Sequence, residues 1–309
     1  MKGKNMKKLM SFIVVVLLAL AATGCSTGKD EASIIIYDGT FSEMKIVHQM
    51  VKMVVEDHTN AKVDIRDEMD EVNTFKEMVA GNVDILNTYD GTLLTTFLKL
   101  DTSDIPEGMS LYDYANGVAS KEKGVHLLNK LGSENTYAVG VLPETAEKYN
   151  LKTISDLAAV SDQLIFGAEH GFYTEEGSMK YTPFIKFYGL NFKENKPIDL
   201  SLKYAAIKNG SIDVTIVYTT DGLNKEAGLV ILEDDRNFFP EYNDALLVRN
   251  DLFERFKDIA PNLEEVLNSL GGQFTDEIMT DLTYEVDVNG RTPEDVAHEY
   301  LLNKGLISK

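Results

Sequence analysis

The 309-residue sequence contains one cysteine, no tryptophan and five histidines. A lone cysteine excludes a disulfide within the chain, so a hydrophobic core has to stabilise the fold, and the length is sufficient for a large one. The histidines are scattered rather than grouped at metal-ligand spacings, which argues against a bound metal. Basic residues are scarce, since 30 lysines and arginines face 50 acids, for a formal net charge of −20. This charge argues against nucleic acids and anionic lipid surfaces as partners.

The sequence also lacks the short motifs that mark common catalytic and nucleotide-binding sites. It contains no G-x-S-x-G, no P-loop, no G-x-G-x-x-G and no H-E-x-x-H. The one cysteine lies close to the N-terminus, where a different role is expected for it. We therefore expect no catalytic residues and no cofactor, and we look for a binding function.

The first 25 residues have the pattern of an export signal. Four lysines within residues 2–8 precede an apolar stretch at 9–22, which is too short to span a bilayer comfortably. The stretch ends in Ala-Ala-Thr-Gly-Cys and resembles a bacterial lipoprotein signal, in which Cys25 is lipidated and becomes the new N-terminus. The alternative is an ordinary secretory signal that ends in a chance cysteine. The lipoprotein interpretation predicts a signal peptide at 1–24, a tether at 25–32 and a protein anchored on the extracytoplasmic face of the cell membrane.

Beyond the tether, short apolar runs alternate with amphipathic segments. This alternation predicts an α/β fold with mostly parallel sheets. Strands are expected at 34–37, 63–65, 83–86, 137–141, 164–166, 214–217, 229–232 and 245–248. Helices are expected at 41–58, 73–80, 91–100, 111–131, 143–149, 179–188, 202–208, 251–258, 262–270, 275–286 and 293–303. The pattern restarts near residue 137 and ends in a helical tail. We expect two lobes, formed by 33–136 with 240–309 and by 137–239, with a ligand in the cleft between them.

Four of the fourteen tyrosines lie at the edges of predicted elements; they are Tyr89, Tyr137, Tyr204 and Tyr218. Open α/β sheets bind ligands outside the carboxyl ends of their strands. Tyrosines that converge there can form an aromatic box, which attracts a quaternary ammonium group through the electron-rich ring faces. The alternative is that these residues are ordinary core tyrosines, which are common at strand ends.

Several stretches resemble the substrate-binding lipoproteins of osmoprotectant ABC importers for glycine betaine and choline. They are N-T-Y-D-G-T (87–92), E-N-T-Y-A-V (134–139), K-Y-A-A-I-K-N-G-S-I-D-V (203–214), V-Y-T-T-D-G (217–222), L-E-D-D-R-N-F-F-P-E-Y-N (232–243) and M-T-D-L-T-Y-E-V-D (279–287). The resemblance implies the two-lobed periplasmic-binding-protein fold, type II. It also implies a cage made of the four tyrosines, with Thr92 as a further ligand contact.

Two loops depart from the family pattern. Family members often carry Gln or Lys after the first strand and a basic residue in the loop after 166–167, and both can face a ligand carboxylate. Here the candidate ligand-binding residues are Asp38, Gly39 and Glu175. The ammonium site is therefore expected to be intact while the carboxylate site is altered. This predicts that choline, or a longer zwitterion such as carnitine, binds at least as well as glycine betaine.

The resemblance implies a non-enzymatic receptor that captures a quaternary-ammonium solute. It would deliver this solute to a membrane permease that a cytoplasmic ATPase drives. Three alternatives remain open: a sensing or adhesion lipoprotein on the same fold, a receptor for a related trimethylammonium compound such as ergothioneine, and an enzyme built on the same scaffold.

Overall fold

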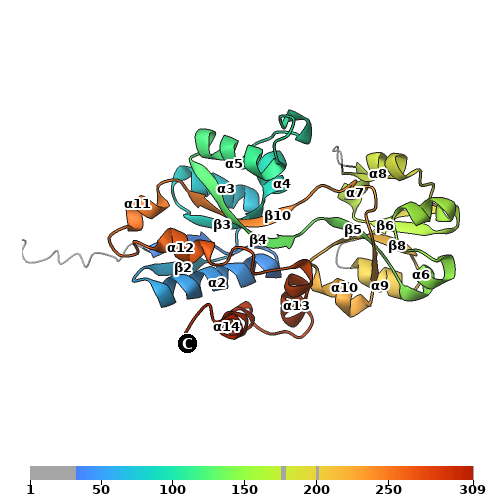
Figure 1. The fold of residues 1–309 in the computed structure, drawn as a ribbon. Helices are drawn as coiled ribbons and strands as arrows, with labels where there is room; N and C mark the ends of the chain where they lie inside the picture. Colours follow the sequence, from blue (N-terminus) through green and yellow to red (C-terminus); the bar gives the residue numbers. More distant parts are fainter. Residues whose placement is uncertain (1–32, 175–178, 200–201, 309) are drawn as a thin grey trace, which may run out of the picture. The chain divides into compact units, whose positions relative to one another are not determined.

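The computed structural model describes residues 33–174, 179–199 and 202–308 (Figure 1). The chain divides into two units, Met1–Ser33 and Ile34–Lys309, and the fold below is that of the second. The expected signal peptide and tether, Cys25 and Glu175 lie outside the described residues.

The strands are β1 Ser33–Tyr37, β2 Lys62–Arg66, β3 Ile85–Tyr89, β4 Val125–Glu134, β5 Tyr137–Val141, β6 Ile165–Ala168, β7 Glu194–Pro197, β8 Val214–Tyr218, β9 Val230–Leu232 and β10 Asn243–Arg249. The helices are α2 Ser42–His58, α3 Glu71–Ala80, α4 Asp90–Thr92, α5 Leu111–Glu122, α6 Pro143–Tyr149, α7 His170–Thr174, α8 Tyr181–Tyr188, α9 Lys203–Lys208, α10 Gly222–Ala227, α11 Leu252–Phe256, α12 Leu263–Asn268, α13 Asp276–Asp287 and α14 Pro293–Lys304. Short helical turns are η1 Leu93–Phe97, η2 Thr102–Asp104, η3 Ser155–Ala159 and η4 Ser161–Gln163.

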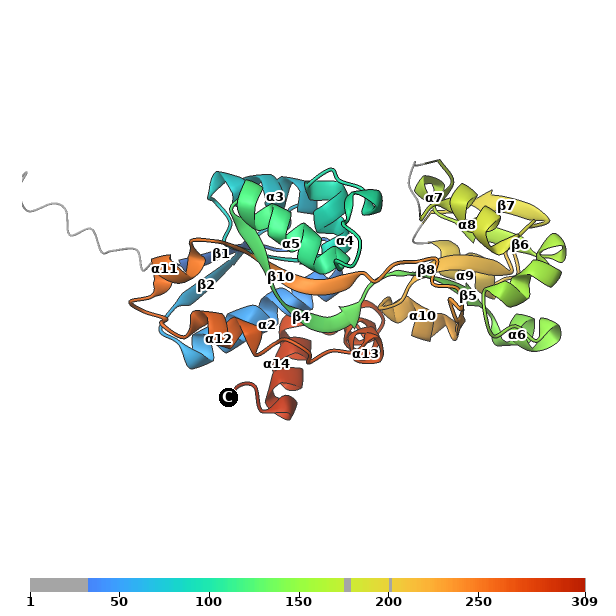
Figure 2. The same ribbon diagram turned by 45° about the horizontal axis from the view of Figure 1, so that its top comes forward.

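The first large sheet has the order β3-β10-β4, and helices cover both of its faces (Figures 1 and 2). Because side chains alternate along a strand, neighbouring residues of β10 enter different cores. Leu246 and Val248 pack in a cluster with α2, α12 and α14, whereas Ala245 and Leu247 pack in a cluster with α3 and α5. β1 and β2 pair beside this sheet and contribute Ile34 to the first cluster.

The second sheet has the order β7-β6-β8-β5-β9. Its strands show the same alternation. Val139 and Ile216 belong to a large aromatic-rich core with α6 and α8, whereas Ala138 and Val217 face a small cluster with α9 and α10. Each sheet is therefore buried on two sides, which explains why inner strands such as β5 and β8 are continuous apolar runs in the sequence.

The expectation of mostly parallel sheets is wrong. β10 runs antiparallel to β3 and β4, and β5 runs antiparallel to β8 and β9, while β6 is parallel to β7 and β8. The alternation of strands and helices gives the elements but not their order in the sheet. A strand that returns from a distant part of the chain, as β10 does, can insert in either direction.

The single helix expected at 111–131 is also wrong, because the structure has the helix α5 followed by the strand β4. Gly124 adopts a left-handed backbone with φ of 70°, which ends the helical turn and redirects the chain. In β4, Val125 and Leu127 face one core and Leu128 and Leu131 the other. A short run with two buried faces has no clear helical or strand period, which explains the error.

The chain passes between the two sheets at two places that lie side by side. The first crossing joins β4 to β5 and the second joins β9 to β10. The backbone N–H of Asn135 donates to the carbonyl oxygen of Tyr242 at 3.2 Å, and the Thr136 hydroxyl donates to the carbonyl oxygen of Pro240 at 3.1 Å. These bonds hold the two crossings together.

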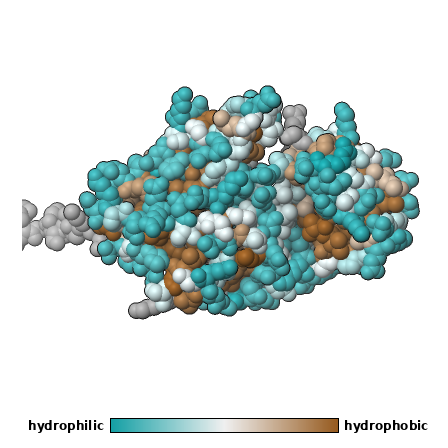
Figure 3. Space-filling view, in the orientation of Figure 1, coloured by the Kyte–Doolittle hydropathy of each residue, from teal (hydrophilic) through white to brown (hydrophobic). Residues whose placement is uncertain are grey.

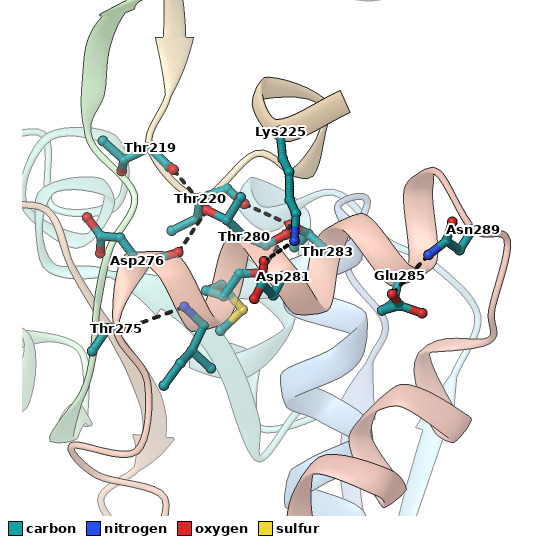
Figure 4. Close-up of polar contacts among 12 residues, drawn as sticks. Thr219, Thr220, Lys225, Thr275, Asp276, Thr280, Asp281, Thr283, Glu285 and Asn289 are labelled. Carbon is teal, nitrogen blue, oxygen red and sulfur yellow. Dashed lines mark hydrogen bonds and ion pairs between the residues drawn. The ribbon is translucent and has the colours of Figure 1, made fainter. Parts of the chain in front are cut away.

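Helix α13 makes a third connection between the regions of the two sheets (Figure 4). The hydroxyl of Thr280 donates to the carbonyl oxygen of Thr219 at 3.2 Å, and that of Thr283 donates to the carbonyl oxygen of Thr220 at 2.8 Å. Both carbonyls belong to the loop that leaves β8. This loop is therefore positioned by a helix that follows it by more than fifty residues in sequence.

The face of the molecule in Figure 3 is dominated by hydrophilic residues and carries separate hydrophobic patches. Among residues 33–174, 179–199 and 202–308, none of the helices has the length and apolar character needed to cross a membrane.

Candidate ligand-binding site

A cavity of about 880 Å³ lies where the crossings meet the ends of β3, β5 and β8. Its lining includes all four expected tyrosines and Thr92. The described lining is Thr40, Phe41, Ser42, Glu43, Glu71, Tyr89, Thr92, Thr95, Thr96, Asn135, Thr136, Tyr137, Met179, Lys180, Tyr204, Tyr218, Thr220, Asp221, Leu223, Tyr242, Thr283 and Asp287. Within this described lining, four acids face one lysine, so the cavity has an excess of negative charge.

Strand ends bring three of the tyrosines to the cavity. Tyr89 is the last residue of β3, Tyr218 is the last residue of β8, and Tyr137 is the first residue of β5. Because β5 and β8 are antiparallel, Tyr137 and Tyr218 are direct partners in the sheet, and their ring centroids lie 5.3 Å apart. The register of the sheet therefore sets the geometry of this pair.

Tyr242 is a fifth tyrosine in the lining and is not among the tyrosines predicted from the sequence. Its ring stacks on that of Tyr89 with centroids 5.5 Å apart and an angle of 29° between the ring planes. It lies on the second crossing, just before β10, within one of the blocks that carried the family resemblance. It lies outside any predicted strand and was therefore not predicted as a site residue. Its position within a family block could have indicated it.

Gly91 and Thr92 hold Tyr242 in place. The hydroxyls of Thr92 and Tyr242 are hydrogen-bonded at 2.8 Å. A Cβ atom added to Gly91 would lie 1.8 Å from Cε2 of Tyr242, so the ring packs directly on the glycine. Thr92 therefore both lines the cavity and orients one of its aromatic walls.

Tyr204 reaches the cavity from α9, and its hydroxyl is already occupied. It donates to the Asp221 carboxylate and also lies 2.9 Å from Oδ1 of Asn224. The neighbouring Lys203 ammonium lies 5.1 Å from the Tyr204 ring centroid and 5.0 Å from that of Tyr218. Lys203 is fully buried and forms an ion pair with Glu169 at 3.0 Å, which fixes a cation beside both rings.

The hydroxyls of Tyr89, Tyr204, Tyr218 and Tyr242 are neutral at physiological pH. Burial is the main cause that raises the pKa of Tyr89, Tyr204 and Tyr218 well above the ordinary value, and it raises the pKa of Tyr242 to about 12. The rings therefore offer π-faces and neutral hydroxyls rather than negative charge.

Lys180 is a cation in the lining and is also not among the residues predicted from the sequence. Its ammonium donates to the Tyr137 hydroxyl at 3.3 Å and lies 5.5 Å from the centroid of that ring. It immediately precedes α8, in a stretch with no distinguishing pattern, so nothing in the sequence marked it.

The structure places Asp38 and Gly39 outside the described lining of the cavity. The Asp38 carboxylate accepts from Nδ1 of the buried His48 at 3.1 Å and from its neighbour's backbone N–H at Gly39. His48 Nε2 accepts the Asn87 N–H at 3.2 Å, so Nδ1 carries the proton that binds Asp38. Asp38 thus links β1 to α2 and β3 in this conformation.

Glu43 is the acid with the most contacts in the cavity. Its carboxylate accepts hydrogen bonds from the hydroxyls of Tyr89, at 2.7 Å, and Thr220. Burial raises the pKa of this carboxyl group to about 7. No group of three or more His, Cys, Asp or Glu side chains in the described part of the chain is arranged to hold a metal ion.

Comparisons with known proteins give matches over most of the chain. Residues 32–303 match the OpuAC family, the substrate binding domain of ABC-type glycine betaine transport systems. The carnitine transport binding protein OpuCC of Listeria monocytogenes is 32% identical over 309 residues, which cover 96% of each chain. The ergothioneine transport permease/ergothioneine binding protein EgtU of Helicobacter pylori is 31% identical over 76% of this chain and 41% of its own length.

A solved structure of a glycine betaine/carnitine/choline ABC transporter protein has a TM-score of 0.80 and 29% identity to this chain. The match covers 89% of this chain and 100% of that one. The expected periplasmic-binding-protein fold and the expected absence of enzymatic function are therefore confirmed at the level of the family. The chain belongs to the OpuAC family of substrate-binding domains and is an extracytoplasmic binding protein of an ABC importer for quaternary-ammonium compounds.

Proposed function

We propose that the cavity holds the ligand's quaternary ammonium group among five tyrosines, the four expected ones and Tyr242. One observation carries this proposal: five aromatic rings from both sheets, α9 and the second crossing line a single cavity whose described lining is acidic overall. A trimethylammonium group cannot donate an N–H hydrogen bond, so ring faces and nearby carboxylates are the groups that can bind it. Each desolvated contact between the cation and a ring contributes up to about 2 kcal/mol.

The other end of the ligand is proposed to meet Lys180. A ligand carboxylate needs a charged partner when it is buried, because an unpaired one costs several kcal/mol. Lys180 lies beside Tyr137, whereas Glu43 binds Tyr89. The positive and the negative side chain therefore lie beside different tyrosines of the cavity. A longer zwitterion such as carnitine can separate its two charges to match. We therefore expect choline or carnitine to bind at least as well as glycine betaine, and the carnitine-binding relative supports this choice.

We further propose that the protein works as two lobes, 33–136 with 240–309 and 137–239, which close on the ligand around the paired crossings. In this proposal a lipid on Cys25 holds the protein at the outer face of the cell membrane. The closed form would deliver its ligand to the permease, driven by a cytoplasmic ATPase, for osmoprotection. The hydrogen bonds between the crossings support a hinge at this position.

Isothermal titration calorimetry with choline, carnitine, glycine betaine, proline betaine and ergothioneine tests the proposed ligand. We expect saturable binding of choline or carnitine, weakened at least tenfold in Tyr218→Ala. Preferred binding of ergothioneine would favour the alternative receptor function instead. Absence of binding by any of the five compounds would contradict the proposal. Import of labelled ligand, lost when the gene is deleted, separates transport from a sensing or adhesion role.

A further inference from the structure

The cavity contains a buried carboxyl group at the point where its walls meet. Glu43 is the second residue of α2 and is 4% exposed, yet it lines the cavity. Its Oε1 accepts from the Tyr89 hydroxyl at the end of β3, and its Oε2 accepts from the Thr220 hydroxyl in the loop after β8. Asn135 on the first crossing directs Nδ2 to the Tyr89 hydroxyl at 3.1 Å and to Oε2 at 3.5 Å. Glu43 thus joins both sheets and a crossing.

The groups that face Glu43 are acidic or neutral. Asp276 on α13 and Asp221 before α10 raise its pKa further, while the hydrogen bonds from Thr220 and Tyr89 lower it. Asp244 on β10 is also buried, and burial and then Glu43 raise the pKa of its carboxyl group. The net result of burial and these neighbours is a pKa of about 7 for Glu43. The carboxyl group is therefore divided between its neutral and ionised forms near neutral pH.

We propose that Glu43 is the counter-ion for the ligand's ammonium group, and that capture of a cation drives the proton off this carboxyl group. The inference rests on the proposed function, because it needs the ammonium to lie among the tyrosines. The ring of Tyr89 lines the cavity, and its hydroxyl binds Glu43. A cation that packs on this ring is therefore separated from the Glu43 carboxylate only by the Tyr89 side chain. An opposite charge at this range favours the ionised form of an acid. The O–H bond of Glu43 breaks and the proton passes to the solvent.

Asn135 can support both protonation states of Glu43. Its Oδ1 is buried and has no hydrogen-bond partner among the described residues. Rotation of the amide by 180° would place this oxygen where Nδ2 now faces Oε2, and it would then accept from a protonated carboxyl group. In the ionised state the present orientation donates to the carboxylate instead. The site therefore changes its protonation by rotating one amide and two hydroxyls, without moving the backbone.

If Glu43 is the counter-ion, its proton release depends on the charge of the ligand and not on the ligand's shape. Choline carries one positive charge and should release the most protons. Glycine betaine carries its own carboxylate, which weakens the field at Glu43, and should release fewer. The alcohol 3,3-dimethylbutan-1-ol has the shape of choline without its charge, and it should release none.

Calorimetry in two buffers with different ionisation enthalpies measures the protons released on binding. For choline at pH 6 we expect close to one proton released and at pH 8.5 close to none, with affinity about tenfold higher at pH 8 than at pH 6. Glu43→Gln should abolish both the release and the pH dependence while choline still binds, more weakly. Asp244→Asn is the matched control, because it removes the neighbouring buried carboxyl group and should leave the release in place.

The outcomes separate this inference from the proposed function. Choline binding to the wild type with no proton release, or with a release that persists in Glu43→Gln, would overturn the inference and leave the function standing. Loss of the release in Asp244→Asn but not in Glu43→Gln would assign the proton to Asp244 and would also overturn it. Failure of the wild type to bind any quaternary-ammonium compound would overturn both. Near-ultraviolet circular dichroism of Glu43→Gln shows whether the variant is folded.

Discussion

Substitution of Gly91 by alanine is expected to damage the cavity although Gly91 itself is not one of the proposed ligand contacts. The glycine is buried in α4 and its backbone is not in the left-handed region, so alanine fits the local conformation. The added Cβ would lie 1.8 Å from Cε2 and 2.3 Å from Cδ2 of Tyr242. No rotation of a methyl group relieves such an overlap, and therefore the tyrosine ring has to leave its position.

The size of the effect follows from the contacts that Tyr242 makes in its present position. Its displacement breaks the hydrogen bond with Thr92, worth about 1 kcal/mol, and the stack on Tyr89, worth about 0.5–1.5 kcal/mol. It also removes one ring face from the cation, worth up to about 2 kcal/mol. The first two losses occur in the free and the bound protein alike and lower its stability, whereas the lost ring face lowers binding. We expect a loss of up to about 2 kcal/mol in binding, which corresponds to choline affinity weakened up to roughly 30-fold.

A double-mutant cycle read by calorimetry tests this reasoning. In a Tyr242→Ala background, Gly91→Ala should cost almost nothing more, because the ring with which it collides is gone. Gly117→Ala in α5 is the matched control, since a Cβ there meets no atom within 4 Å and should leave binding unchanged. Wild-type affinity in Gly91→Ala would refute the steric argument. Full additivity of the two substitutions would show that they act on separate features.

Four further outcomes are expected. Tyr218→Ala should weaken choline binding at least tenfold, with Tyr218→Phe milder because the ring face remains; equal calorimetric affinity for Tyr218→Ala and wild type would make it a core tyrosine. Cys25→Ala should abolish incorporation of labelled fatty acid and release the protein from the membrane fraction; fatty-acid labelling that survives would contradict the anchor. The raised pKa of Glu43, about 7 against an ordinary 4.5, means that its contribution to stability is present below pH 4.5 and is lost as pH rises through 7. Urea titrations from pH 5 to 8 should therefore show a fall that Glu43→Gln reduces by about 3 kcal/mol; an equal fall in both proteins would refute this. Saturating choline should lower the radius of gyration in small-angle scattering, whereas an unchanged radius would indicate a rigid pocket.

The sequence was sufficient for most of the local structure. The burial of β5 and β8 on both faces and the apolar stripe of α2, with Met44, Val47 and Val51 buried, follow directly from the runs and the spacing of apolar residues. Prediction failed at 111–131, because a left-handed glycine divides a helix from a strand that is buried on both faces. It also failed for the direction of the strands. The periodicity of apolar residues describes a single segment and does not indicate which strand it pairs with or in which direction.

The candidate site was predicted in part. Tyr89, Tyr137, Tyr204 and Tyr218 were named from the edges of predicted elements and from the family blocks, and Thr92 from the family blocks alone. The structure brings all five to one cavity. Their role as ligand contacts stays a prediction. Three residues of the lining were missed. Lys180 and Glu43 have no local signature, whereas Tyr242 lies in a family block but outside any predicted strand.

What the sequence determined by itself is therefore most of the elements, the family, and the tyrosines placed at the edges of elements. What only the tertiary structure decided is which of these residues meet. Tyr242 binds Thr92 across 150 positions, and Glu43 binds Thr220 across 177. The physical reason is that side-chain periodicity is a local property, whereas contact between distant segments depends on strand order, register and the crossings between the two sheets. The proton-binding character of Glu43 depends on that burial, because an exposed glutamate at the start of α2 would keep its ordinary pKa.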